Sequence, residues 1–127
     1  EKAFQLLSKQ AFAGNSAFAL YLIGEMYWNG YYVKKDHKAA FRIFQNALKI
    51  SSKDGRTEYC QADIYMKLGD SFMEMGTDNE LALNSYQEAE KGFYVQRKAL
   101  FKGTAEKLKR VVKKQGEARR EIHKALK

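Results

Sequence analysis

Residues 19–48 constrain the fold more than any other stretch, because they have the pattern of two helices joined by a polar loop. In the first half, apolar residues recur at steps of three and four, at Ala19, Ile23, Met26 and Tyr27. The second half repeats this spacing at Ala40, Phe44 and Ala47. Such steps place side chains on one face of a helix, and Asn29-Gly30 interrupts the pattern between the two halves. The stretch therefore predicts an antiparallel helical hairpin.

Two residues of this hairpin carry more specific expectations. Gly24 lies on the apolar face of the first helix, where a glycine costs about 1 kcal/mol relative to alanine, so it indicates close approach of a neighbouring helix. Asp36 precedes the second helix, where a carboxylate favours the helix dipole and can cap the first turn.

The same residues carry a family resemblance. Ile23-Gly24-x-x-Tyr27, Asn29-Gly30, Val33-x-x-Asp36 and Ala40-x-x-x-Phe44-x-x-Ala47 together resemble a Sel-like repeat, the long-looped branch of the tetratricopeptide superfamily. Ala40 follows Gly24 at a greater distance than in an ordinary tetratricopeptide unit, and the extra residues lengthen the loop as in Sel-like repeats. Tyr32 departs from the pattern, since the family commonly has glycine there. The resemblance implies an all-α, right-handed helix-turn-helix solenoid that binds other proteins or peptides.

Further repeats flank this unit. Residues 1–15 match the second helix of a repeat and imply that repeats once preceded it, with Phe4, Leu6 or Leu7 exposed at the end. Residues 16–50 are the Sel-like repeat. Residues 57–92 form a tetratricopeptide-like repeat, in which the landmarks Leu68-Gly69-x-x-Phe72 and Ala82-x-x-x-Tyr86-x-x-Ala89 stand closer together. Its loop supplies N-cap residues just before Glu80.

Residues 93–127 are expected to form a basic capping segment. A narrow apolar stripe runs along it, at Phe101, Ala105, Leu108, Val112, Ile122 and Leu126. Gly103 and Gly116 are the candidate breaks in this helix, and Gly116 is the favoured one because the stripe thins around it. Terminal units of a solenoid need a polar outer face, which the surplus of lysine and arginine supplies.

Ligand positions follow from the resemblance, since family ligands lie in a concave groove lined by the first helix of each repeat. Counting from the glycine places them in the first full repeat at Phe18, Tyr21, Leu22, Glu25, Trp28 and Asn29. In the second they fall at Asp63, Lys67, Asp70, Met73 and Glu74. The aromatic side chains suit protein contact, and the carboxylates favour a partly basic peptide. Packing at the repeat junction is the alternative role for Trp28, and plain solvation is the alternative for the carboxylates.

Charge suggests a second interpretation. The chain has a net charge of +8, and residues 97–127 hold 12 Lys or Arg against 3 Glu. Candidate contacts for an anionic partner are Lys107, Lys109, Arg110, Lys113, Lys114, Arg119 and Arg120. A solvated capping face is the main alternative. An acidic protein is favoured over nucleic acid, because no aromatic residue follows Phe101 to stack on bases.

Catalysis and cofactors find no support in the sequence. His37 and His123 have no partners at metal-ligand spacing, and Cys60 is the single cysteine. No glycine-rich phosphate loop and no nucleophile elbow occurs. The longest uncharged run, from Gln10 to Gly24, is shorter than a membrane span of about 20 residues. We therefore expect a non-enzymatic protein-interaction scaffold without cofactor, small-molecule substrate or membrane span.

Overall fold

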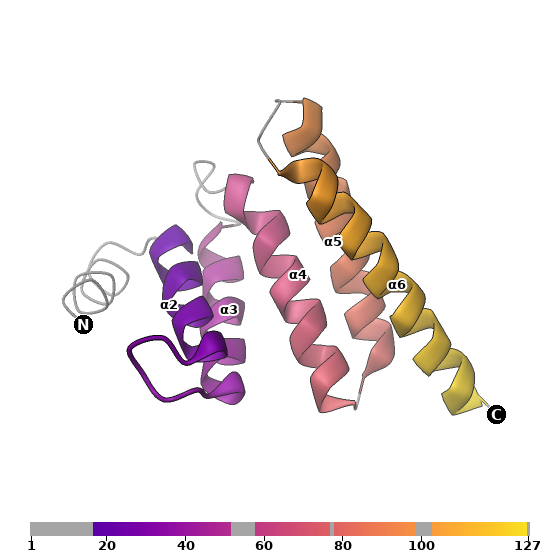
Figure 1. Ribbon diagram of the computed structural model, residues 1–127, viewed down its shortest axis with the longest axis horizontal. Helices are drawn as coiled ribbons and strands as arrows, with labels where there is room; N and C mark the ends of the chain where they lie inside the picture. Colours follow the sequence, from indigo (N-terminus) through magenta and orange to yellow (C-terminus); the bar gives the residue numbers. More distant parts are fainter. Residues whose placement is uncertain (1–16, 52–57, 77, 99–102, 127) are drawn as a thin grey trace. The chain divides into compact units, whose positions relative to one another are not determined.

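A computed structural model describes residues 17–51, 58–76, 78–98 and 103–126, and every regular element in these ranges is an α-helix. In chain order the helices are α2 (Ala17–Asn29), α3 (His37–Ser51), α4 (Glu58–Met75), α5 (Asn79–Lys98) and α6 (Thr104–Leu126) (Figure 1). The predicted half repeat at 1–15, with Phe4, Leu6 and Leu7, lies outside the described residues. The chain divides into two compact units, residues 1–60 and 61–127.

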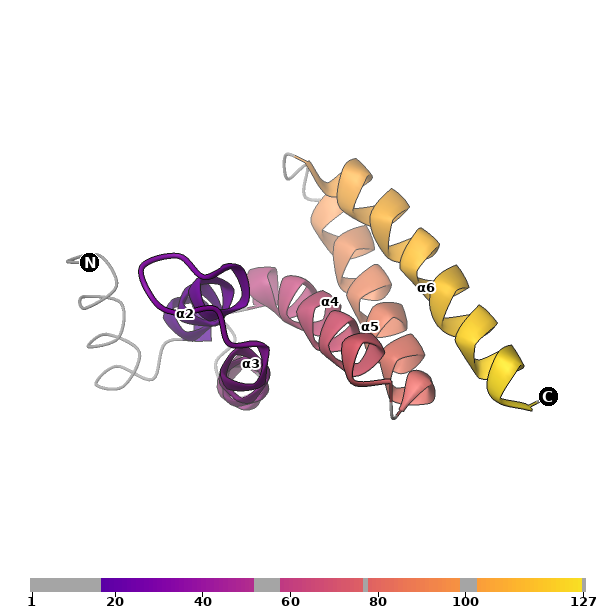
Figure 2. The same ribbon diagram turned by 60° about the horizontal axis from the view of Figure 1, so that its bottom comes forward.

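The first unit contains the α2–α3 hairpin, whose two helices lie side by side in Figures 1 and 2. Phe44 of α3 is fully buried and faces Gly24 of α2. A Cβ atom added at Gly24 would lie 2.5 Å from Phe44 Cε1, closer than any real Cβ contact. The close helix approach predicted from this glycine is therefore confirmed, and the ring of Phe44 fills the space.

The loop between α2 and α3 is held by its own backbone. The amides of Gly30 and Tyr31 both donate to Met26 O, at 2.7 and 2.9 Å. The amide of Asp36 donates to Tyr27 O at 2.9 Å, while its carboxylate Oδ1 accepts from the Ala39 amide at 3.1 Å. Asp36 is thus the N-cap of α3, as predicted.

Tyr32 lies in the same loop with a φ of 65°, the left-handed region that glycine adopts readily and other residues avoid. It is also the position where the resemblance leads one to expect glycine. The loop therefore has, at Tyr32, a backbone conformation that suits glycine.

The second unit packs α4, α5 and α6 around one core, and α6 runs alongside α5 (Figures 1 and 2). Its buried members are Ala62, Met66, Ala82, Tyr86, Ala89, Phe93, Leu108, Val111 and Ala118. Two glycines allow the helices to approach: a Cβ at Gly69 would lie 2.5 Å from Tyr86 Cε1, and one at Gly92 would lie 2.6 Å from Ala62 Cβ. The Gly69–Tyr86 contact repeats the Gly24–Phe44 contact of the first unit.

The ends of α5 and α6 test two predictions, the N-cap before Glu80 and the helix break at Gly116. Asp78 Oδ1 accepts from the Leu81 amide at 3.0 Å, so the predicted N-cap before Glu80 is confirmed. The predicted break at Gly116 is wrong, because α6 continues through it to Leu126. The break lies at Gly103, whose φ of 81° places it outside the helix that begins at Thr104.

The predicted apolar stripe of α6 is only partly right. Leu108 is buried as expected, but Ala105 is exposed, and Val112 and Leu126 are 51% and 81% exposed. The buried line instead passes through Thr104, Leu108, Val111, Gln115 and Ala118. Val111 and Val112 point about 100° apart on the helix. The buried line of Val111 also contains the polar Gln115, so an apolar pattern in the sequence does not show that this line faces inward.

No helix in the described ranges is both long and apolar enough to cross a membrane.

Candidate interaction surfaces

The α2 surface consists of the six predicted ligand positions of the first full repeat, at Phe18, Tyr21, Leu22, Glu25, Trp28 and Asn29. The Phe18 side chain is 55% exposed, while Tyr21 and Leu22 are half-buried. Tyr21 Oη donates to Glu25 Oε1 at 2.6 Å, and the Tyr21 ring lies 5.9 Å from that of Phe44. The side chain of Asn29 donates to Glu25 O at 2.9 Å. The α2 surface therefore combines an exposed aromatic ring with a carboxylate whose position is fixed.

Trp28 is half-buried by a contact within its own hairpin. Its ring is stacked on the ring of His37, with centroids 3.9 Å apart and planes 7° from parallel. His37 Nε2 also lies 3.0 Å from Trp28 O. From the sequence, His37 was considered only as a possible metal ligand, and its role in joining the ends of α2 and α3 was missed. The sequence did contain one indication of this contact, because Trp28 and His37 lie at the two ends of the loop in the predicted hairpin.

The predicted ligand positions of α4 have a different environment. Lys107 Nζ lies 2.8 Å from Asp63 Oδ1, and Lys114 Nζ lies 2.5 Å from Asp70 Oδ1. The two carboxylates are two helical turns apart on α4, and the two lysines have the same spacing on α6. Because the order of the partners is the same on both helices, α4 and α6 run parallel and are joined by two ion pairs.

Tyr86 of α5 joins the second of these ion pairs. Its Oη donates to Asp70 Oδ1 at 2.6 Å, and Lys114 Nζ lies 5.8 Å from the centre of its ring. Burial, followed by the charge of Asp70 and the hydrogen bond to it, raises the pKa of Tyr86 well above its usual value. The Asp70 carboxylate thus connects all three helices of the second unit. Asp63 and Asp70 make their contacts within the chain, which the sequence did not predict.

The other α4 candidates lie in separate environments. Met73 packs against the core of the second unit. Lys67 is half-buried, and its carbonyl accepts from Ser71 Oγ at 2.9 Å. Glu74 is exposed near the end of the helix.

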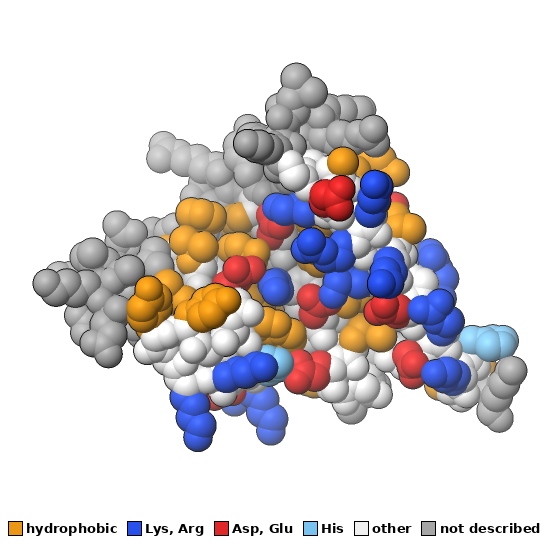
Figure 3. All heavy atoms as spheres, in the orientation of Figure 1, with side chains coloured by type: hydrophobic (Ala, Val, Ile, Leu, Met, Phe, Trp, Pro, Cys, Tyr) orange, Lys and Arg blue, Asp and Glu red, His pale blue; other side chains and the backbone are white. Residues whose placement is uncertain are grey.

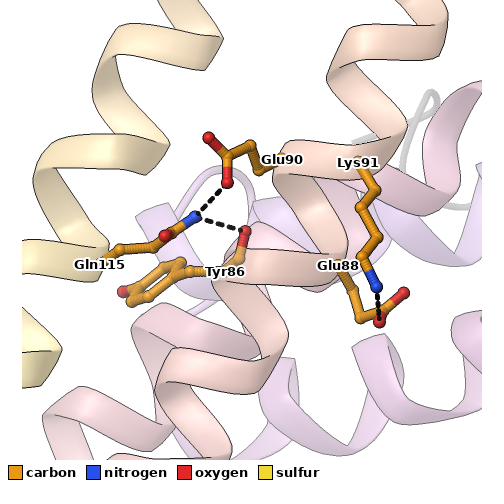
Figure 4. A network of polar contacts seen from close by, with 5 residues as sticks. All are labelled: Tyr86, Glu88, Glu90, Lys91 and Gln115. Atoms are coloured by element: carbon orange, nitrogen blue, oxygen red, sulfur yellow. Dashed lines mark hydrogen bonds and ion pairs between the residues drawn. The ribbon is translucent and has the colours of Figure 1, made fainter.

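Gln115 anchors α6 to α5 from within the core. Its Nε2 donates to Glu90 Oε1 at 3.0 Å and to Tyr86 O at 3.4 Å, while its side chain is almost completely buried (Figure 4). Arg119 Nη2 donates to Gln115 Oε1 at 3.4 Å and so is tied to the same group. A buried amide costs free energy unless its polar atoms are bonded, so these contacts explain why a polar residue occupies the inward line of α6.

The remaining candidate cations lie on the outer side of α6. Lys109 is 79% exposed, with Nζ 4.0 Å from Glu106 Oε1. Arg110, Lys113 and Arg120 are exposed and have no ion-pair partner among the described residues. Figure 3 shows Lys and Arg side chains gathered over this helix. The basic set predicted from the sequence is therefore split: Lys107 and Lys114 neutralise carboxylates of α4, Arg119 bonds the buried Gln115, and the others face solvent.

Within the described part of the chain, no three His, Cys, Asp or Glu side chains are placed to hold a metal ion. Comparisons of this chain with protein-family models, with curated proteins and with solved structures gave no match.

Proposed function

We propose that this chain is a helical-repeat module of the Sel-like and tetratricopeptide type, a right-handed solenoid with a binding rather than a catalytic role. The support is a recurring contact. The ring of Phe44 packs against Gly24, and the ring of Tyr86 packs against Gly69. In both cases a Cβ atom added to the glycine would lie 2.5 Å from Cε1 of the ring. The first glycine and its ring are further apart along the chain than the second pair, as the longer loop of the first repeat requires. Two hairpins thus use the same packing device.

The observation that favours a binding site is the α2 surface. Phe18 is a large apolar side chain that is 55% exposed, and it lies one helical turn from Tyr21. Aromatic side chains that are held rigidly contribute most to protein interfaces, because little conformational entropy is lost when they are buried. The Glu25 carboxylate, fixed by Tyr21, would select a basic group in the partner. We therefore propose that α2 binds a peptide or helix that combines an apolar anchor with a Lys or Arg.

The α4 carboxylates contribute less to this proposal. A partner cation at Asp63 or Asp70 would have to compete with Lys107 or Lys114, which are already in contact at 2.8 and 2.5 Å. Separating such a pair leaves a partly buried charge uncompensated, which is costly. We accordingly place the main contact of the proposed partner on α2.

The test is affinity capture from the source cell with two matched baits. One carries Phe18→Ala and Glu25→Ala on the α2 surface, and the other carries Gln45→Ala and Asn46→Ala, two exposed positions of α3. Circular dichroism first establishes that both variants keep the helix content of the unchanged chain. Captured proteins are then quantified by mass spectrometry.

The proposal expects at least one protein that the unchanged chain and the α3 variant capture equally and the α2 variant loses. That protein should bind the purified chain directly, with an affinity that falls when its own basic residues are neutralised. If every captured protein is retained by the α2 variant, the α2 surface is not the binding site and the proposed function is wrong.

A further inference from the structure

Gly116 is the one glycine within the described helices that no neighbouring side chain explains. At Gly24, Gly69 and Gly92 an added Cβ would meet another helix at 2.5 to 2.6 Å, so each of these glycines permits a close contact. At Gly116, in the middle of α6, an added Cβ would meet nothing within 4 Å. A glycine in a helix interior costs stability relative to alanine. The exception suggests that α6 presents Gly116 to a helix outside the described structure.

The surroundings of Gly116 have the character of such a contact. Ala105, Lys109, Val112 and Gly116 follow one another at steps of three and four, so they share one side of α6. Close by, Tyr94 of α5 and Leu108 complete the lining of an open depression of about 430 Å³ with Ala105, Lys109 and Val112. Tyr94 and Val112 are 50% and 51% exposed. We call this side, with Tyr94, the Val112–Gly116 face.

Charge indicates what kind of helix would fit there. Lys109 lies in the face, and Lys113 and Arg120 lie beside it at its outer edge. Two carboxylates of α6 lie close to these three cations: Glu106 Oε1 is 4.0 Å from Lys109 Nζ, and Glu117 is one helical turn from both Lys113 and Arg120. Glu90 of α5 is bonded to Gln115. Three cations therefore stand against two carboxylates. The face is therefore apolar along its centre and positive along its edge, and the potential favours an acidic partner.

We propose that the Val112–Gly116 face binds an acidic amphipathic helix of another protein, which places an aromatic side chain over Gly116. The contact would reproduce the way α3 covers Gly24 with Phe44 and α5 covers Gly69 with Tyr86. It is independent of the α2 surface, which belongs to the other compact unit.

The probe is a peptide taken from the chain itself. Residues 79–95 of α5 already place Tyr86 over a glycine, and a hydrocarbon cross-link that replaces Asn84 and Lys91 keeps the peptide helical. With capped ends, its charge of −3 comes from Glu80, Glu88 and Glu90. A second peptide carries Tyr86→Ala. Binding of the labelled peptides to the full 127-residue chain is measured by fluorescence anisotropy at low and physiological salt.

Three variants of the chain separate the proposed site from any other. Gly116→Ala fills the space over α6 and should weaken peptide binding about tenfold, while it raises the folding equilibrium constant about fivefold because the helix gains a better helix former. The double variant Lys109→Glu and Lys113→Glu should weaken binding at least tenfold at low salt. Lys91→Glu, one substitution of the same kind at an exposed position of α5, should leave binding within twofold.

The outcomes decide between occupants. Binding that is lost with Gly116→Ala, with the charge reversal and with Tyr86→Ala in the peptide supports the proposal. Absence of binding at millimolar peptide and low salt overturns it, as does binding unchanged by Gly116→Ala. The proposal is also overturned if single-stranded RNA binds more tightly than the peptide and Gly116→Ala does not change the RNA affinity, because the cations then bind a nucleic acid. A dimer of the chain alone that Gly116→Ala dissociates overturns it as well, since the occupant is then a second copy.

Discussion

Gly69→Ala adds a single methyl group where the second unit has no room for it. The new Cβ would lie 2.5, 2.7 and 2.8 Å from three ring carbons of Tyr86. The ring has little freedom to move away, because Tyr86 is 2% exposed and its hydroxyl is bonded to Asp70 at 2.6 Å. The helices themselves must therefore separate.

The expected change in the free energy of unfolding is the difference between two effects. Overpacking of a well-packed core costs about 3 kcal/mol at the upper end of its usual range, which suits three contacts well under 3.0 Å. Replacing glycine by alanine in a helix returns about 1 kcal/mol. The net expectation is a loss of about 2 kcal/mol. Gly116→Ala, in the same unit but with nothing within 4 Å, should gain about 1 kcal/mol from the second effect alone.

Urea denaturation followed by circular dichroism in the far ultraviolet measures both variants. With a slope of about 2 kcal/mol per molar urea, the midpoint should fall by about 1 M for Gly69→Ala and rise by about 0.5 M for Gly116→Ala. The opposite signs at two helical glycines are the decisive feature. Equal shifts in the same direction would refute the argument, since helix propensity alone would then determine the effect of both substitutions.

Three other predictions follow from single contacts. Tyr32→Gly should stabilise the chain by about 1 kcal/mol in a thermal melt, because φ at this position is 65° and glycine adopts it without strain. Asp36→Ala and Asp78→Ala should each cost about 1 kcal/mol of unfolding free energy in urea, since each removes an N-cap, whereas Asn in either position should restore most of it. The raised pKa of Tyr86 means that the folded state keeps its proton while the unfolded state loses it above about pH 10. Stability should therefore fall above about pH 10, by up to about 1.4 kcal/mol per pH unit for this group, and the fall should be shallower in Tyr86→Phe.

The helical hairpins were predictable from the sequence because their signals are local. Apolar steps of three and four around Ile23 and Phe44 fix the inward faces of two helices, and Gly24 lies on the inward face of the first. The N-cap role of Asp36 was likewise predictable, since an N-cap depends only on the residues that follow it. The conformation at Tyr32 was not predicted, because a residue other than glycine rarely adopts a φ of 65°.

The environment of α6 was not predictable in the same way. Its ion pairs join Lys107 to Asp63 and Lys114 to Asp70 between helices that α5 separates in the chain, and both depend on which line of α6 faces inward. That line was assigned through Val112, whereas the structure buries Val111. Adjacent valines give no local reason to choose between them. The line that is buried also carries Gln115, which bonds to Glu90 and Tyr86 of α5, contacts that no local pattern shows. As a result, the candidate ligand carboxylates and the candidate basic contacts proved to be partners of one another.

A purely capping role does not account for α6. One side does what a cap requires: Leu108 and Val111 close the core, and Lys107 and Lys114 neutralise α4. A cap needs only solvated residues on its other side, and alanine, lysine or glutamate at positions 112 and 116 would give a more stable and more soluble helix. The chain instead has a valine that is 51% exposed and a glycine with open space over it, and exposed cations lie nearby. These residues cost stability in the isolated chain, and a helix bound across them would recover it.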